Sequence, residues 1–215
     1  MPKPAKLLAG LCVVAVLAVV LTGVTQRNSL AFTIGVAPSL PVLELQPREV
    51  ACQTPITVPA GGEFDRVALT LAGGQEGRVE ILDPDAGREL ARGTLRGGYP
   101  DRSEQVVRVG EVSDAQRVSV CLRNLGSRKL TVYGNAEAAA RYSAVTYKDA
   151  AQPIDMAVRF ERAPRSGLSL LGLSFDHASL FKFTWMGGWT FWLLTVLVVL
   201  AIPALLVRAL RGALE

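Results

Sequence analysis

Two long apolar runs lie near the ends of the chain. Leu7–Val24 contains 18 residues and Trp189–Val207 contains 19, and neither run carries a charged side chain. A helix rises about 1.5 Å per residue, so roughly 20 apolar residues reach across the ~30 Å hydrocarbon layer of a bilayer. The pattern therefore predicts two transmembrane α-helices that flank the middle of the chain.

Between these runs, apolar and polar residues alternate with the two-residue period of β-strands. Strands are predicted at Val42–Leu45, Ile56–Val58, Phe64–Leu71, Arg78–Leu82, Glu89–Leu95, Gln105–Val109, Arg117–Arg123, Lys129–Tyr133, Ala140–Tyr147 and Ile154–Phe160. Because Pro55 and Pro59 bracket the second of these, it is expected to be an edge strand. Many short strands without a convincing helix predict a mainly β fold, an antiparallel jelly-roll-like β-sandwich.

The two patterns divide the chain into four parts. Residues 1–26 are an N-terminal transmembrane anchor or uncleaved signal, and residues 27–165 are the β-sandwich. Residues 166–186 are a juxtamembrane segment, for which an interfacial helix and a final strand plus linker fit equally. Residues 187–215 are the C-terminal transmembrane helix with a short basic tail. The first run is longer than the core of a usual signal peptide, which favours a retained anchor over a cleaved one.

The charges set the expected orientation. The formal net charge is +4, yet residues 28–180 hold 17 Lys and Arg against 18 Asp and Glu, so the excess lies beside the apolar runs. A nucleic-acid-binding protein would carry its cations on a folded face, so nucleic acid is excluded as a partner. Lys3 and Lys6 precede the first run, and Arg208 and Arg211 follow the second. The positive-inside rule then places both termini in the cytoplasm and the sandwich outside the plasma membrane, as in a two-pass protein.

Aromatic residues support a membrane boundary at the second run. All three Trp residues of the chain, Trp185, Trp189 and Trp192, lie at its start. Amphipathic rings prefer the headgroup level, so we assign these residues to the membrane interface.

The cysteines predict one disulfide bond. Cys52 and Cys121 both lie in the segment expected outside the cytoplasm, where disulfides persist. Cys121 falls on the strand face opposite Val118, Val120 and Leu122. The bridge is therefore expected either at the outer surface of the sheet or pinning the N-terminal segment across it.

No catalytic constellation or metal centre is found in the sequence. The chain has one histidine, His177, with no nucleophile marked out beside it, and no cofactor is expected. Asp83 and Asp85 could ligate calcium, but Pro84 and Gly87 favour a simple turn. The chain is therefore interpreted as a non-enzyme.

The best candidate for exposed recognition is a loop aromatic. Tyr99 is preceded by two glycines and followed by Pro100, Asp101 and Arg102. A ring beside an acid and a guanidinium could stack against a sugar and hydrogen-bond to it. The alternative is a turn whose Tyr99 ring covers the core.

The stretch Phe64–Tyr133 resembles jelly-roll domains of the galactose-binding and carbohydrate-binding-module type. The residues that carry this resemblance are Val67, Leu69 and Leu71, then Val79–Asp83, Gly87–Leu90 and Val118–Leu122. The whole chain is also similar to two-anchor envelope proteins of actinobacteria that are associated with membrane glycosyltransferases, through Gly97–Asp101, Val132–Asn135 and Gly187–Thr190. An excess of Arg over Lys fits such a genome.

The resemblance implies a non-catalytic accessory protein of the cell envelope. Its expected partners are the bilayer and either an envelope membrane protein, such as a glycosyltransferase, or a surface glycan. Two alternatives remain open at this point: an envelope carbohydrate-active enzyme that uses acidic residues, and a purely structural scaffold.

Overall fold

The computed structural model describes residues 3–136, 143–167, 170, 172, 175, 178 and 187–212. The chain forms two compact units, one of Met1–Asn28 with Pro164–Glu215 and the other of Ser29–Ala163. The two helices are α1 (Lys3–Thr25) and α3 (Gly188–Gly212). The strands are β1 (Arg27–Thr33), β2 (Leu40–Leu45), β3 (Val50–Thr57), β4 (Phe64–Ala72), β5 (Gly77–Leu82), β6 (Glu89–Leu95), β7 (Ser103–Val112), β8 (Arg117–Asn124), β9 (Leu130–Asn135), β10 (Ala144–Tyr147), β11 (Ala150–Gln152), β12 (Asp155–Met156) and β13 (Val158–Ser166).

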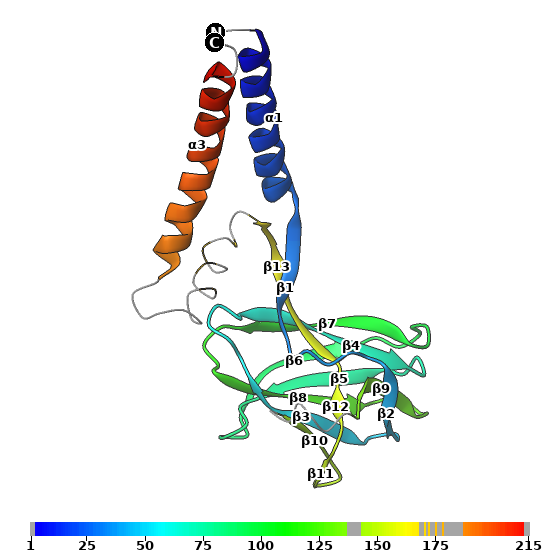
Figure 1. Ribbon diagram of the computed structural model, residues 1–215. Helices are drawn as coiled ribbons and strands as arrows, with labels where there is room; N and C mark the ends of the chain where they lie inside the picture. Colours follow the sequence, from blue (N-terminus) through cyan, green and yellow to red (C-terminus); the bar gives the residue numbers. More distant parts are fainter. Residues whose placement is uncertain are drawn as a thin grey trace. The chain divides into compact units, whose positions relative to one another are not determined.

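The strands form two antiparallel sheets in jelly-roll order (Figure 1). One sheet contains the path β2-β9-β4-β7, and the other contains β3-β8-β5-β6. From β2 to β9 each strand lies in the opposite sheet from the strand before it, except that β5 and β6 are neighbours in one sheet, which is the strand order of a jelly roll. β1, β12 and β13 extend the first sheet, and β10 and β11 extend the second. This topology confirms the mainly β, antiparallel sandwich expected from the alternation.

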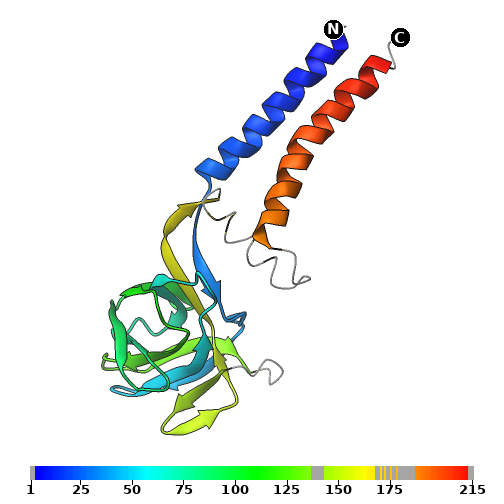
Figure 2. The same ribbon diagram turned by 90° about the vertical axis from the view of Figure 1, so that its left-hand side faces the viewer.

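Alternation along the strands explains why the sheets face one another. Val67, Leu69 and Leu71 of β4 have no solvent exposure, and neither do Val120 and Leu122 of β8. Because side chains at positions i and i+2 share one face of a strand, each sheet offers a continuous apolar surface to the other. Figure 2 shows the strands wrapping around this shared interior.

The first half of β3 departs from the expectation. The two flanking prolines predicted a short edge strand, but β3 begins at Val50 and lies between β8 and β10. Its pairing with β8 shifts register between Gln53 and Ile56, at the cis peptide Thr54–Pro55. At such an irregularity the strand does not need the ladder hydrogen bond that proline cannot donate, so an interior strand tolerates it.

Cys52 and Cys121 form the predicted disulfide between β3 and β8. The two residues are direct register partners on neighbouring strands, and they lie on the face opposite Val120 and Leu122. The sequence left two positions open for the disulfide, and in the structure it lies on the outer face of the sheet. Cys121 is nevertheless 1% exposed, because β8 is flanked on both sides by β3 and β5.

One polar side chain joins the two sheets through the core. Gln53 of β3 is fully buried, and its Nε2 donates to Asp155 Oδ1 at 2.5 Å and to Ser143 Oγ at 2.8 Å. Its Oε1 accepts a hydrogen bond from the Met156 backbone N–H at 2.8 Å. Because both the NH₂ and the oxygen of this amide are hydrogen-bonded, burying it does not carry the cost of an unsatisfied polar group.

The two apolar runs are helical. α1 and α3 belong to the same compact unit and contact each other. Among the residues that the structure describes, no helix has the length and apolarity needed to cross a membrane, so the transmembrane assignment gains no support there. Most of residues 166–186, including Trp185 and His177, lie outside the described residues.

Candidate functional site

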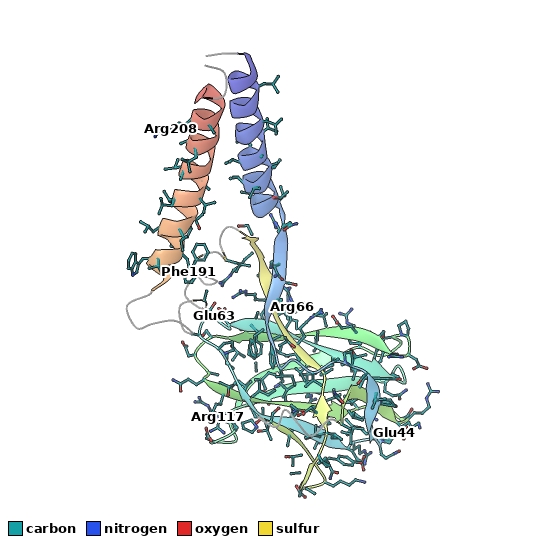
Figure 3. All side chains as sticks on the ribbon, viewed as in Figure 1. Glu44, Glu63, Arg66, Arg117, Phe191 and Arg208 are labelled. Atoms are coloured by element: carbon teal, nitrogen blue, oxygen red, sulfur yellow. A yellow bond between two sulfur atoms is a disulfide. The ribbon has the colours of Figure 1, made fainter. Side chains whose placement is uncertain are left out.

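A pocket of about 450 Å³ opens between two connections of the sandwich. One side is the turn from β5 to β6, and the other is the loop from β7 to β8. The lining residues are Asp83, Asp85, Arg88, Leu90, Glu111, Val112, Ser113, Asp114, Ala115, Gln116 and Arg117. We call it the loop pocket; Figure 3 labels Arg117, which lies at its rim. Sequence reasoning missed it because its two sides come from segments more than 20 residues apart.

The turn side of the loop pocket is held by its own hydrogen bonds. Asp83 Oδ1 accepts the backbone N–H groups of Asp85 at 2.9 Å and Ala86 at 3.1 Å, which confirms the turn expected here. These two hydrogen bonds, more than the nearby charges of Arg88 and Arg117, lower the pKa of Asp83. Its carboxylate therefore stays ionised across the physiological range.

An ion pair connects the two sides. Arg117 Nη1 lies 3.2 Å from Asp85 Oδ1 and 3.4 Å from Oδ2, so both carboxylate oxygens are within reach of one guanidinium nitrogen. Both side chains are exposed, at 48% and 71%, so this pair contributes little to stability. It holds two charged groups at the rim where an incoming ligand would meet them.

Three of the residues that line the loop pocket, Leu90, Val112 and Ala115, are apolar, and we call them its apolar floor. Leu90 and Ala115 are partly buried and pack against the core, and Val112 is 6% exposed. Glu111, Ser113 and Asp114 stand on the loop side and are exposed. The other eight lining residues are polar or charged, and we call them its polar rim. The volume of about 450 Å³ lies within the range of about 300 to 1,000 Å³ of small-molecule sites.

The acidic residues of the loop pocket give no support for a metal site. Across the residues that the structure describes, no group of three or more His, Cys, Asp and Glu side chains is arranged to hold a metal ion. The calcium alternative for Asp83 and Asp85 gains no support from this geometry.

The Tyr99 loop is built differently from the expectation. Tyr99 is only 9% exposed and belongs to the hydrophobic core, so its ring does not lie open to a sugar. Burial raises the pKa of its hydroxyl, as expected for a group withdrawn from water. The alternative reading, in which this ring covers the core, is the arrangement that the fold adopts.

Asp101 and Arg102 also have structural partners. Asp101 Oδ1 accepts the backbone N–H of Gly73 at 2.7 Å, a hydrogen bond that joins two turns. The Arg102 guanidinium lies 5.7 Å from the centre of the Tyr133 ring, within cation–π range. Each of the three residues grouped by the sequence therefore has contacts of its own within the fold.

A second charged cluster holds the β10–β11 hairpin. Glu49 Oε2 accepts the Tyr147 hydroxyl at 2.5 Å, and Glu49 Oε1 lies 3.0 Å from Lys148 Nζ. The Tyr147 hydroxyl is the largest contribution that lowers the pKa of Glu49 to about 2. Because each group is already engaged, this cluster fastens two segments and offers no open site.

Two of the three predicted interface residues are described. Trp189 is 59% exposed and Trp192 is 46% exposed, at the start of α3. Phe175 packs against both Phe191 and Trp192, with ring centres 5.8 and 5.1 Å apart.

The comparisons with known proteins assign no family. No protein-family model matches the sequence, and no curated protein does. Among solved structures, a match is the carbohydrate-binding module CsCBM6-3 of Clostridium stercorarium, solved in complex with cellobiose. It has 10% sequence identity and a TM-score of 0.32, and it covers 49% of this chain and 71% of that one. A likeness this distant does not transfer a ligand, so the fold assignment rests on the strand order itself.

Proposed function

We propose that the chain is a non-catalytic binding protein of the cell envelope whose sandwich holds a saccharide in the loop pocket. The observation that carries the proposal is the pocket itself, about 450 Å³ with an apolar floor and a charged rim. A sugar ring has an apolar C–H face and a rim of hydroxyl groups. The floor suits the ring face, and the carboxylates and guanidinium groups suit the hydroxyls, which both donate and accept hydrogen bonds.

The charged residues of the loop pocket fit saccharide binding without catalysis better than they fit glycoside hydrolysis. A glycosidase needs one carboxylic acid with a raised pKa to protonate the leaving group. Asp83 has a lowered pKa, and Asp85 is ion-paired with Arg117. The Asp83 carboxylate therefore suits hydrogen-bond acceptance and not proton donation, and Asp85 is already engaged by a guanidinium. Turnover of a bound oligosaccharide would favour the enzyme alternative, and an absence of any binding would favour the scaffold.

We further propose that α1 and α3 attach the chain to the plasma membrane as a two-pass protein, with the sandwich outside the cytoplasm. Many apolar side chains of both helices are exposed, including Leu11, Leu17, Val19, Leu193 and Leu200. Exposed apolar side chains on a helix favour an apolar surrounding. The hydroxyls of their Thr residues donate to carbonyls of their own helix, at Thr22, Thr25 and Thr195, as lipid requires.

Protease protection tests this attachment. Protease added to intact spheroplasts should digest the sandwich and spare tags placed at both chain ends. Extraction of the chain by alkaline carbonate without detergent, or digestion of the terminal tags, would contradict membrane anchoring with this topology. In this setting we propose a surface glycan, or the membrane glycosyltransferase that handles it, as the partner.

Filling the loop pocket should abolish saccharide binding. Ser113 is exposed and lines the pocket, so Ser113→Trp adds a large ring there without changing a buried residue. Titration of the full chain in detergent micelles with neutral and amino-bearing oligosaccharides should show at least a tenfold loss of affinity, about 1.4 kcal/mol or more.

Thr94→Trp provides the matched control. Thr94 is exposed on β6 and does not line the pocket, so this variant should bind like the wild type. Equal binding by wild type and Ser113→Trp would place the saccharide elsewhere and overturn the proposed site.

A further inference from the structure

The two sides of the loop pocket differ in how their charges are compensated. On the turn side, Asp85 is paired with Arg117, and Asp83 is satisfied by two backbone N–H groups beside Arg88. On the loop side, Glu111 has no ion-pair partner in the part of the chain that the structure describes. Asp114 accepts only the Ser113 hydroxyl there, at 3.2 Å. The loop side is therefore an uncompensated acidic wall.

The charge sum of the lining agrees with this asymmetry. The lining holds four carboxylates, Asp83, Asp85, Glu111 and Asp114, against the two guanidinium groups of Arg88 and Arg117. Four negative and two positive charges leave two negative charges in excess. A cationic group of a ligand is therefore favoured next to Glu111 and Asp114, and an anionic ligand is repelled.

The same observations indicate what kind of cation fits. The described residues hold no cluster suited to a metal ion, so the acidic wall is not explained as a metal site. The volume of about 450 Å³ and the floor of Leu90, Val112 and Ala115 suit an organic ring. A sugar ring that carries an ammonium group meets the floor with its C–H face and the acidic wall with its charge.

We propose, building on the proposed function, that the loop pocket selects saccharides with a free amino group over their N-acetylated, neutral and uronate counterparts. The turn side, whose charges are compensated, receives the hydroxyl groups. The loop side, through Glu111 and Asp114, receives the ammonium.

The expected preference is moderate and sensitive to salt. Both carboxylates are exposed, and contacts between exposed charges are weak and screened. Two such contacts favour the amino sugar over its N-acetylated counterpart by about threefold to tenfold in Kd at low salt. The preference should shrink as the ionic strength rises past about 0.1 M.

The test compares matched ligands on the full chain in detergent micelles. The ligands are oligosaccharides of glucosamine, of N-acetylglucosamine, of glucose and of glucuronic acid, of equal length. The variant Glu111→Gln with Asp114→Asn removes the two charges and keeps the side-chain shapes. The control is Glu44→Gln on β2. It removes a carboxylate that is paired with Lys129 and lies outside the pocket.

The outcomes separate this inference from the proposed function. We expect the glucosamine oligomer to bind most tightly, and the double variant alone to reduce its affinity to that of the N-acetylated oligomer. Equal binding of all four ligands, or an unchanged preference in the double variant, overturns the amino-sugar selectivity and leaves saccharide binding in place. Binding of none of the four overturns both.

Discussion

Replacing Phe160 with Ala should lower the free energy of unfolding of the sandwich by about 3–5 kcal/mol. Phe160 lies on β13 and is fully buried. Its ring stacks on Phe32 with centres 4.2 Å apart, and it meets the edge of the Phe64 ring at 4.7 Å. The three rings join β1, β4 and β13, so their loss removes packing between strands that are distant in the sequence. Truncation also leaves a cavity that the surrounding strands fill only in part.

Urea unfolding followed by far-UV circular dichroism measures this effect. Tryptophan fluorescence would not report on it, because all three Trp residues lie at positions 185–192, outside the sandwich unit. Phe160→Leu keeps most of the volume and should cost less than about 1.5 kcal/mol. A Phe160→Ala variant as stable as the wild type would mean that this cluster is not part of the core.

Removing the disulfide should lower the free energy of unfolding by about 4 kcal/mol in the chain-entropy treatment. The bridge joins Cys52 to Cys121, which are 69 residues apart in the sequence. Closing so long a loop restricts the unfolded chain strongly, and opening it restores that freedom. The paired variant Cys52→Ala with Cys121→Ala should therefore unfold at a clearly lower urea concentration.

Chemical reduction of the wild type is the matched control for the paired alanines. The reduced wild type and the alanine pair should have similar urea midpoints, since both lack the same covalent link. An alanine pair with the midpoint of the oxidised wild type would contradict a stabilising bridge between β3 and β8.

Alternation predicted the strands whose two faces differ most. β4 and β8 each place a run of aliphatic residues on one face. In the structure β4 pairs with β13, and β8 pairs with β3. The sequence did not predict β1, because Arg27–Thr33 lacks regular alternation. The sequence predicted β3 as a short edge strand because of Pro55. In the structure the register shift after Gln53 accommodates this proline within the sheet.

Site residues were harder to predict because they depend on long-range pairing. Tyr99 has the neighbours of an exposed loop residue, but the fold places its ring in the core. The loop pocket forms where Asp85 and Arg117, 32 residues apart, are brought together. A signal was present in the acidic residues of both connections, yet nothing local indicated that the turn after β5 and the loop before β8 would be neighbours.

Identification of the residues that a bound saccharide touches tests the central claim most directly. A photoreactive glucosamine oligosaccharide would be crosslinked to the full chain in detergent micelles, and the labelled peptides would be mapped by mass spectrometry. We predict labels within residues 83–90 and 111–117, which an excess of unlabelled oligosaccharide removes. Labels confined to Tyr99–Arg102 or to other parts of the sandwich would contradict the loop pocket as the binding site.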